Sequence, residues 1–199
     1  MEKRYGITRT PGEPDWADIP RAQVDCACWG TTYTPETTFQ CAYQTGKALY
    51  IRMECHEAEP LARCREQDGR VWFDSCMEAF LAPAREGSYM NLECNSIGAM
   101  LCSAGSERYV RQNLAESGLP RPVLRSLVGG ERWEIRLEIA AATLRGLWNL
   151  ELVPGGQLYG NFYKCGDETP QPHFVTWSPV DLPEPNFHAP HCFGVLELL

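Results

Sequence analysis

Nine consecutive residues, Arg132-Trp133-Glu134-Ile135-Arg136-Leu137-Glu138-Ile139-Ala140, alternate between charged and apolar side chains. This period of two predicts a β-strand whose apolar side chains face a core while its charged side chains face solvent, as in an antiparallel sheet. Residues 47–55 repeat the alternation, with Leu49, Ile51 and Met53 on the apolar side. Two such strands indicate a sheet with one buried face.

Shorter runs of the same kind occur along the rest of the chain. They predict further strands near residues 22–28, 37–43, 76–82, 88–95, 98–102, 122–128, 157–164 and 193–199. Helix is expected only over residues 107–116, with one turn near residues 141–144. About ten short strands with little helix predict an all-β fold, a sandwich of two mainly antiparallel sheets of the jelly-roll or immunoglobulin-like kind.

The chain has 199 residues and a formal net charge of −8, a length that suits one domain over residues 1–199. The acidic balance, without a block of Lys or Arg, argues against binding to nucleic acid or to an anionic membrane and favours a small neutral ligand. No apolar run approaches the ~20 residues that span a bilayer, and no signal sequence is visible. We therefore expect a cytoplasmic protein, or a secreted one if a leader has been removed. The oligomeric state stays open.

The ten cysteines are too sparse for a disulfide scaffold. Six of them fall in apolar, strand-like stretches, where a free thiol behaves as a small hydrophobic side chain. These six are Cys26, Cys28, Cys41, Cys55, Cys76 and Cys94. No Cys-x-x-Cys motif occurs, so neither a zinc knuckle nor a thioredoxin-type site is supported. We expect reduced core thiols and no disulfide that folding requires.

Two indoles and a carboxylate form a candidate ligand site: Trp72 and Glu78 in the run of residues 71–80, and Trp177 at the end of residues 173–177. A pyranose has apolar C–H faces and a rim of hydroxyls, so its sites combine flat aromatic rings with fixed hydrogen-bonding groups. An extended strand would separate residues 72 and 78 by ~20 Å, too far for one hexose. Trp72 is therefore predicted on a loop that curls back toward the strand of Glu78.

Asn91 and Glu93 are further candidates, because their segment could pair with the Glu78 strand across the turn near residues 83–88. Plainer interpretations remain open for the main candidates. Trp72 could be a core tryptophan, and Glu78 could face solvent. Trp177 could anchor the proline-rich loop that is expected over residues 170–190.

Several segments resemble the family 9 carbohydrate-binding modules, most closely a branch of free-standing small proteins. The resemblance runs from about residue 12 to residue 199. It is carried by Gly12-Glu13-Pro14-Asp15-Trp16, residues 72–80, Tyr89-Met90-Asn91-Leu92-Glu93-Cys94-Asn95, Asn161-Phe162-Tyr163-Lys164-Cys165, Pro185-Asn186-Phe187-His188 and Phe193-Gly194. It implies a β-sandwich module that holds one sugar, often by its reducing end, between two tryptophans.

Carried over residue by residue, the resemblance implies that Trp72 is the first stacking indole, Glu78 the carboxylate and Trp177 the second indole. Asp74 matches an acidic position in the same motif. Family members can carry an arginine in the strand equivalent to residues 89–95, and this chain has none there. The family's calcium sites cannot be traced onto this chain, so no cofactor is expected, with a structural calcium ion left open.

Two other classes of function compete with sugar binding. A glycoside-active enzyme could use Glu78 together with Asp74 or Glu93 as its two carboxylates. A metal or haem site could use the ligand-type side chains near the C-terminus, whose spacing matches no strong zinc pattern: His173, His188, His191, Cys165 and Cys192. We predict non-catalytic binding of a mono- or oligosaccharide.

Overall fold

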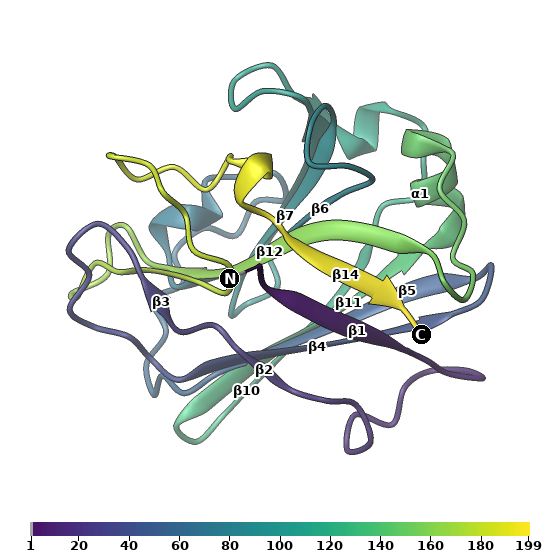
Figure 1. Ribbon diagram of the computed structural model, residues 1–199. Helices are drawn as coiled ribbons and strands as arrows, with labels where there is room; N and C mark the ends of the chain where they lie inside the picture. The colour runs from purple at the N-terminus through teal and green to yellow at the C-terminus, as the bar shows by residue number, and fades with distance from the viewer. Residues whose placement is uncertain (1) are drawn as a thin grey trace.

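The computed structural model describes residues 2–199, and strands make up most of its regular structure (Figure 1). The strands are β1 (Arg4–Arg9), β2 (Ala22–Gln23), β3 (Cys26–Ala27), β4 (Thr37–Gln44), β5 (Ala48–Cys55), β6 (Cys76–Ala82), β7 (Tyr89–Asn95), β8 (Met100–Gly105), β9 (Gln112–Asn113), β10 (Val123–Gly129), β11 (Arg132–Ala140), β12 (Gln157–Cys165), β13 (Phe174–Thr176) and β14 (Gly194–Leu198). The described residues hold one α-helix, α1 (Ala141–Trp148), and 3-10 turns at Val71–Phe73, Leu114–Glu116 and Pro190–Cys192. About 9 % of residues are helical, so the β-rich, helix-poor class is confirmed.

The strands form one curled, mixed sheet in the order β10-β11-β5-β4-β1-β14-β12-β6-β7-β8-β9. Most neighbours run antiparallel, but β1 pairs in parallel on both sides. Arg4 lies opposite Val195 of β14, and Thr8 lies opposite Ala42 of β4. In Figure 1, β1 is the dark strand between β4 and β14, where it joins the two halves of the sheet. The pairing is mainly antiparallel, as predicted, but the strands form one mixed sheet in place of the two predicted sheets.

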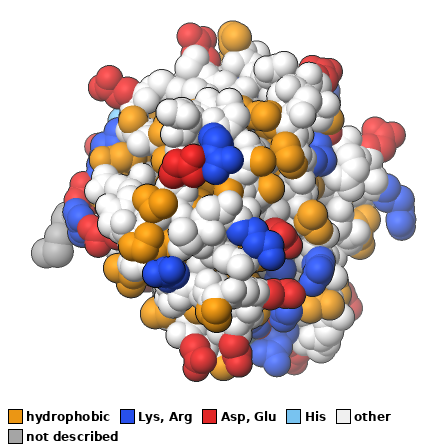
Figure 2. Space-filling model, turned by 90° about the vertical axis from the view of Figure 1, so that its right-hand side faces the viewer, with side chains coloured by type: hydrophobic (Ala, Val, Ile, Leu, Met, Phe, Trp, Pro, Cys, Tyr) orange, Lys and Arg blue, Asp and Glu red, His pale blue; other side chains and the backbone are white. Residues whose placement is uncertain are grey.

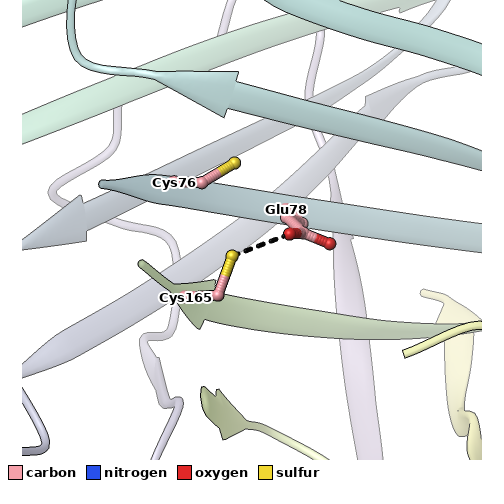
Figure 3. A group of neighbouring side chains, drawn as sticks. All are labelled: Cys76, Glu78 and Cys165. Atoms are coloured by element: carbon pink, nitrogen blue, oxygen red, sulfur yellow. Dashed lines mark hydrogen bonds between the residues drawn. The ribbon is translucent and has the colours of Figure 1, made fainter. Parts of the chain in front are cut away.

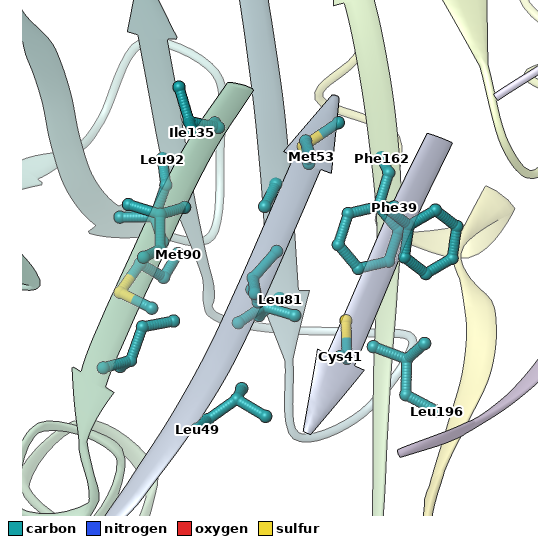
Figure 4. Packing of buried hydrophobic residues seen from close by; sticks show 14 of the residues in the cluster. Phe39, Cys41, Leu49, Met53, Leu81, Met90, Leu92, Ile135, Phe162 and Leu196 are labelled. Carbon is teal, nitrogen blue, oxygen red and sulfur yellow. The ribbon is translucent and has the colours of Figure 1, made fainter. Parts of the chain in front are cut away.

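The curl places the two halves of the sheet face to face around the main core (Figure 4). Phe39 of β4 stacks on Phe162 of β12, with ring centroids 3.7 Å apart. The apolar side chains predicted from alternation on β5 and β11 are all buried. Each fully buried side chain of this size stabilises the fold by about 1.5 to 3 kcal/mol, so the alternating strands fix which face of the sheet is inside.

Three local expectations differ from the structure. Residues 107–116 form no helix; they hold an exposed loop, the short β9 and a 3-10 turn, because Leu114 is the only buried residue among them and one apolar contact cannot hold a helix face. The helix instead follows β11 and is longer than the single predicted turn, ending at Asn149 in the left-handed conformation. The predicted loop of residues 170–190 contains β13, which pairs with β12.

All ten cysteines carry free thiols. Six of them are buried: Cys41, Cys55, Cys76, Cys94, Cys102 and Cys165. Cys26 and Cys28, which were expected in the core, are only half-buried, because Cys26 lies in the two-residue strand β3 at the margin of the sheet and Cys28 follows directly after that strand.

One face of the surface mixes side chains of every kind (Figure 2). On the face drawn in Figure 2, acidic, basic and apolar side chains are interspersed, and no large block of one charge gathers there. No helix within residues 2–199 has the length and apolar character needed to cross a bilayer.

Candidate functional site

A cavity of about 510 Å³ lies on the side of β6 and β7 that faces away from the main core. Along β6, Met77, Ala79 and Leu81 enter the main core, so the alternating side chains between them point to the other side. The segment between β13 and β14 covers part of this second face and forms one wall of the cavity. The period of two in β6 therefore separates the residues of the core from the residues of the site.

Glu78, Asn91 and Glu93 lie together at the floor of the cavity. The pairing of β6 with β7 puts Glu78 directly opposite Glu93, and Asn91 follows on the same face. Asn91 donates from Nδ2 to Glu93 Oε1 at 2.8 Å, and Cys165 of β12 donates from Sγ to Glu78 Oε1 at 3.0 Å. The predicted pairing of these two segments is confirmed, and the three polar side chains are at most 5 % exposed.

Burial favours the protonated form of the acids in this cavity. It raises the pKa of Glu93 to about 7, against the opposing effects of the Asn91 hydrogen bond and the Arg111 charge. Burial, followed by the neighbouring Cys165 and Glu93, raises the pKa of Glu78 well above its usual range. Asp167, at the cavity wall, has its pKa raised by burial to about 6. A protonated carboxyl both donates and accepts a hydrogen bond, which suits a hydroxyl ligand.

Arg111 places a guanidinium beside β7 in the wall of the cavity. It reaches Asn91 Oδ1 from Nε at 2.9 Å and from Nη2 at 2.6 Å, and it lies 4.2 Å from the ring centroid of Tyr89. Sequence reasoning missed Arg111 because it lies 20 positions after Asn91, in a stretch that was expected to be helical. No pattern in the sequence pointed to Arg111 as a neighbour of Asn91.

Trp72 sits in the 3-10 turn Val71–Phe73 immediately before β6, so the predicted curl toward Glu78 is confirmed. Its indole is half-buried and lines the cavity rather than the main core. A second aromatic wall comes from Trp29, Phe174 and Phe187. Trp29 packs against both phenylalanines, with ring centroids 5.7 and 5.6 Å apart, and donates from Nε1 to the carbonyl of Leu182 at 2.7 Å. Nothing in the sequence around Trp29 distinguished it from a turn residue.

Trp177 does not lie in the cavity, and its prediction as the second stacking indole is wrong. It is 3 % exposed and packs in the main core against Phe39 and Phe162, at centroid distances of 5.2 and 6.0 Å. The cause is the alternation of β13: Phe174 faces the cavity, so the side chain three positions later faces the opposite side. The plainer interpretation, an anchoring tryptophan, fits this position.

Asp74 also lies outside the cavity. Its buried carboxylate accepts hydrogen bonds from the backbone N–H groups of Arg63 and Cys64 at 3.0 and 2.9 Å, and from Asn95 Nδ2 at 2.9 Å. These three donors occupy the carboxylate and tie the preceding loop to β7. The prediction of Asp74 as a ligand contact is wrong, because its hydrogen-bonding capacity is used inside the fold.

The ligand-type side chains near the C-terminus do not gather into one group. His188 lines the cavity and bonds through Nδ1 to the hydroxyl of Tyr89 at 2.8 Å. His173 is buried elsewhere, where its Nε2 lies 2.6 Å from Lys164 Nζ. Burial lowers the pKa of His188 to about 3 and that of His173 to about 4, so both rings are neutral at ordinary pH.

Glu93→Gln should stabilise the protein at neutral and alkaline pH. Because the folded-state pKa of Glu93 is raised from 4.5 to about 7, its contribution to stability is fully present below pH 4.5 and is lost as the pH rises through 7. The neutral amide cannot ionise, so the variant should exceed the wild type by about 3 kcal/mol at pH 8 and match it near pH 4. Chemical denaturation across this range measures the difference. The exposed Glu138 serves as control, because Glu138→Gln should show no such dependence on pH; a flat difference for Glu93→Gln as well would contradict the assignment.

The sequence matches a known protein family. The model of carbohydrate-binding family 9 matches residues 11–198. No curated protein matches the sequence at a significant level. A candidate carbohydrate-binding protein from Bacteroides uniformis ATCC 8492 has a similar crystal structure, with a TM-score of 0.84, 28 % identity and full coverage of both chains.

Two further structures are of a family 9 carbohydrate-binding module from Caldicellulosiruptor kristjanssonii. The complex with glucose has a TM-score of 0.72 and 13 % identity, covering 99 % of this chain and 96 % of that one. The complex with cellotriose has a TM-score of 0.71 and 13 % identity, covering 98 % and 93 %. At this level of identity the likeness shows a shared fold.

Proposed function

The chain belongs to carbohydrate-binding family 9, and from that premise we propose that its cavity binds a mono- or oligosaccharide without cleaving it. One observation carries the proposal: the half-buried indole of Trp72 stands over a floor of buried hydrogen-bonding groups, Glu78, Asn91 and Glu93. An aromatic face beside fixed polar groups is the chemistry that a pyranose ring requires. The volume of about 510 Å³ lies in the range of small-ligand pockets.

The sugar would lie between Trp72 and the wall formed by Trp29 and Phe174, in place of the Trp72–Trp177 pair. Its hydroxyls would meet the floor, where the raised pKa values of Glu78 and Glu93 favour carboxyl groups that both donate and accept hydrogen bonds. Because the floor is closed by buried side chains, the end of a saccharide chain fits better than its middle. The reducing end is the end that the family resemblance implies.

Calorimetry with glucose, cellobiose and cellotriose tests the proposal, since family 9 modules with the same fold have been solved with glucose and with cellotriose. Glu78→Leu should weaken binding by roughly tenfold or more, because it leaves a sugar hydroxyl without a partner in a buried site. Glu78→Gln should retain more of the affinity, because the amide keeps one donor group and one acceptor. Equal affinity for all three proteins would contradict a role for Glu78.

Glycoside cleavage is the rival for the same residues. Asp74 cannot take part, because it lies outside the cavity and is fully hydrogen-bonded. The Glu78–Glu93 pair is adjacent across two strands, but both pKa values are raised, whereas a retaining hydrolase needs one carboxylate ionised as nucleophile. We expect no release of product from aryl glycosides. Turnover that is lost in Glu78→Gln would establish the enzyme instead.

A further inference from the structure

Cys76, Glu78 and Cys165 form a compact group (Figure 3), and the last two of them line the cavity. Cys76 lies directly opposite Cys165 in the β6–β12 ladder, and Glu78 follows two residues later on the same face. The two Sγ atoms and a carboxylate oxygen all lie within 4.8 Å of one another, and all three residues are buried. Among residues 2–199 this is the one group of three side chains of ligand type with that spacing. The group could not be predicted from the sequence, because Cys76 and Cys165 are 89 positions apart.

Glu78 is a residue with 3 % exposure that lines the cavity, and its carboxyl has few partners within the protein. Its only hydrogen bond within the described chain comes from the Sγ of Cys165, a weak donor, and none of the ion pairs there includes it. Buried carboxyl groups normally have several strong donors or a cation. Asp74, with three donors, shows how this fold satisfies such a group elsewhere. The unused capacity of Glu78 therefore points to a ligand.

We propose that Cys76, Cys165 and Glu78 bind one thiophilic divalent cation, of which Zn²⁺ is the representative. Two thiolates and one carboxylate are a ligand set for zinc, whereas calcium prefers oxygen ligands alone. Ligand atoms around a tetrahedral zinc lie roughly 3.5 to 4 Å apart, which small rotations of these three side chains can reach. On binding, the two thiols and the carboxyl release three protons to solvent as three metal–ligand bonds form.

The fourth coordination position would open to the cavity, because Glu78 and Cys165 both line it. Water or a sugar hydroxyl would occupy that position, as in zinc sites with three protein ligands. Oxidation to a Cys76–Cys165 disulfide is the competing fate of two opposed thiols. Forming the disulfide would consume an oxidant and would leave the Glu78 side chain without its only hydrogen-bond donor. The carboxyl beside the two thiols therefore favours a bound cation over a disulfide.

The test is a titration of the reduced, metal-free protein with Co²⁺, followed by displacement with Zn²⁺. The expected result is one equivalent of Co²⁺ with thiolate-to-metal charge-transfer absorption, which Zn²⁺ abolishes. Cys76→Ala and Cys165→Ala should each weaken binding by ~10-fold or more. Cys41→Ala removes a buried thiol of the main core and is the matched control, with affinity unchanged.

X-ray absorption of the zinc-loaded wild type keeps the test independent of the variants, should either of them fail to fold. Two sulfur scatterers at about 2.3 Å are expected in the first coordination shell. Three results would overturn the proposal: no binding at ~10 µM metal, which is weak for a site of three ligands; a first shell of oxygen and nitrogen alone; or a Cys76–Cys165 disulfide in protein handled under air with no metal bound.

Discussion

Trp177→Ala should lower the free energy of unfolding by about 3 to 5 kcal/mol, because it removes an indole from the main core and leaves a cavity between Phe39 and Phe162. The indole packs directly against the backbone at Gly194, where a Cβ atom would lie only 2.4 Å from the Trp177 ring. Urea denaturation at neutral pH measures the change. A loss below ~1 kcal/mol would show that Trp177 is not a core residue, because large-to-small core substitutions of this kind cost several times more.

Trp72→Ala should weaken sugar binding by about 2 kcal/mol or more, which corresponds to roughly 30-fold in Kd, because it removes the aromatic face over the cavity floor. The fold should survive, since the indole is half-buried and lies outside the main core. Calorimetry with cellotriose measures the affinity, and thermal melting of the same sample confirms folding.

Trp16→Ala is the matched control for Trp72→Ala. Trp16 is a half-buried tryptophan that does not line the cavity, so its removal should leave the affinity for sugar unchanged. The substitutions in the cavity and in the core should therefore have opposite effects. Trp72→Ala should affect binding more than stability, and Trp177→Ala should affect stability more than binding. Wild-type affinity in Trp72→Ala would exclude stacking on this indole.

Much of the fold was predictable because local alternation dictates it. The strands β5 and β11 fall where a period of two was clear, β6, β7 and β12 fall where further strands were predicted, and the inward side chains of all five contribute to the main core. The closure by β1 was not predictable, because that strand has only Tyr5 and Ile7 as buried apolar residues and pairs with segments far along the chain. A short strand has too few alternating residues to be predicted from its own sequence, because its formation depends on the strands with which it pairs.

The site was predictable where one strand pair carries it. Glu78, Asn91 and Glu93 share a face because β6 and β7 are joined by a short turn, and the spacing of Trp72 from Glu78 required a curl. Trp29, Arg111 and Cys165 arrive from distant segments, and only the folded chain brings them to the cavity. Trp177 was misplaced for a related reason: a strand of three residues determines which way it points, and no periodicity reveals so short a strand.

A crystal structure of the protein with cellotriose tests the central claim most directly. The account predicts one sugar ring in the cavity, with its face on the indole of Trp72 and its hydroxyls within hydrogen-bonding distance of Glu78, Asn91 or Glu93. Sugar bound at another surface, with this cavity filled only by water, would contradict it.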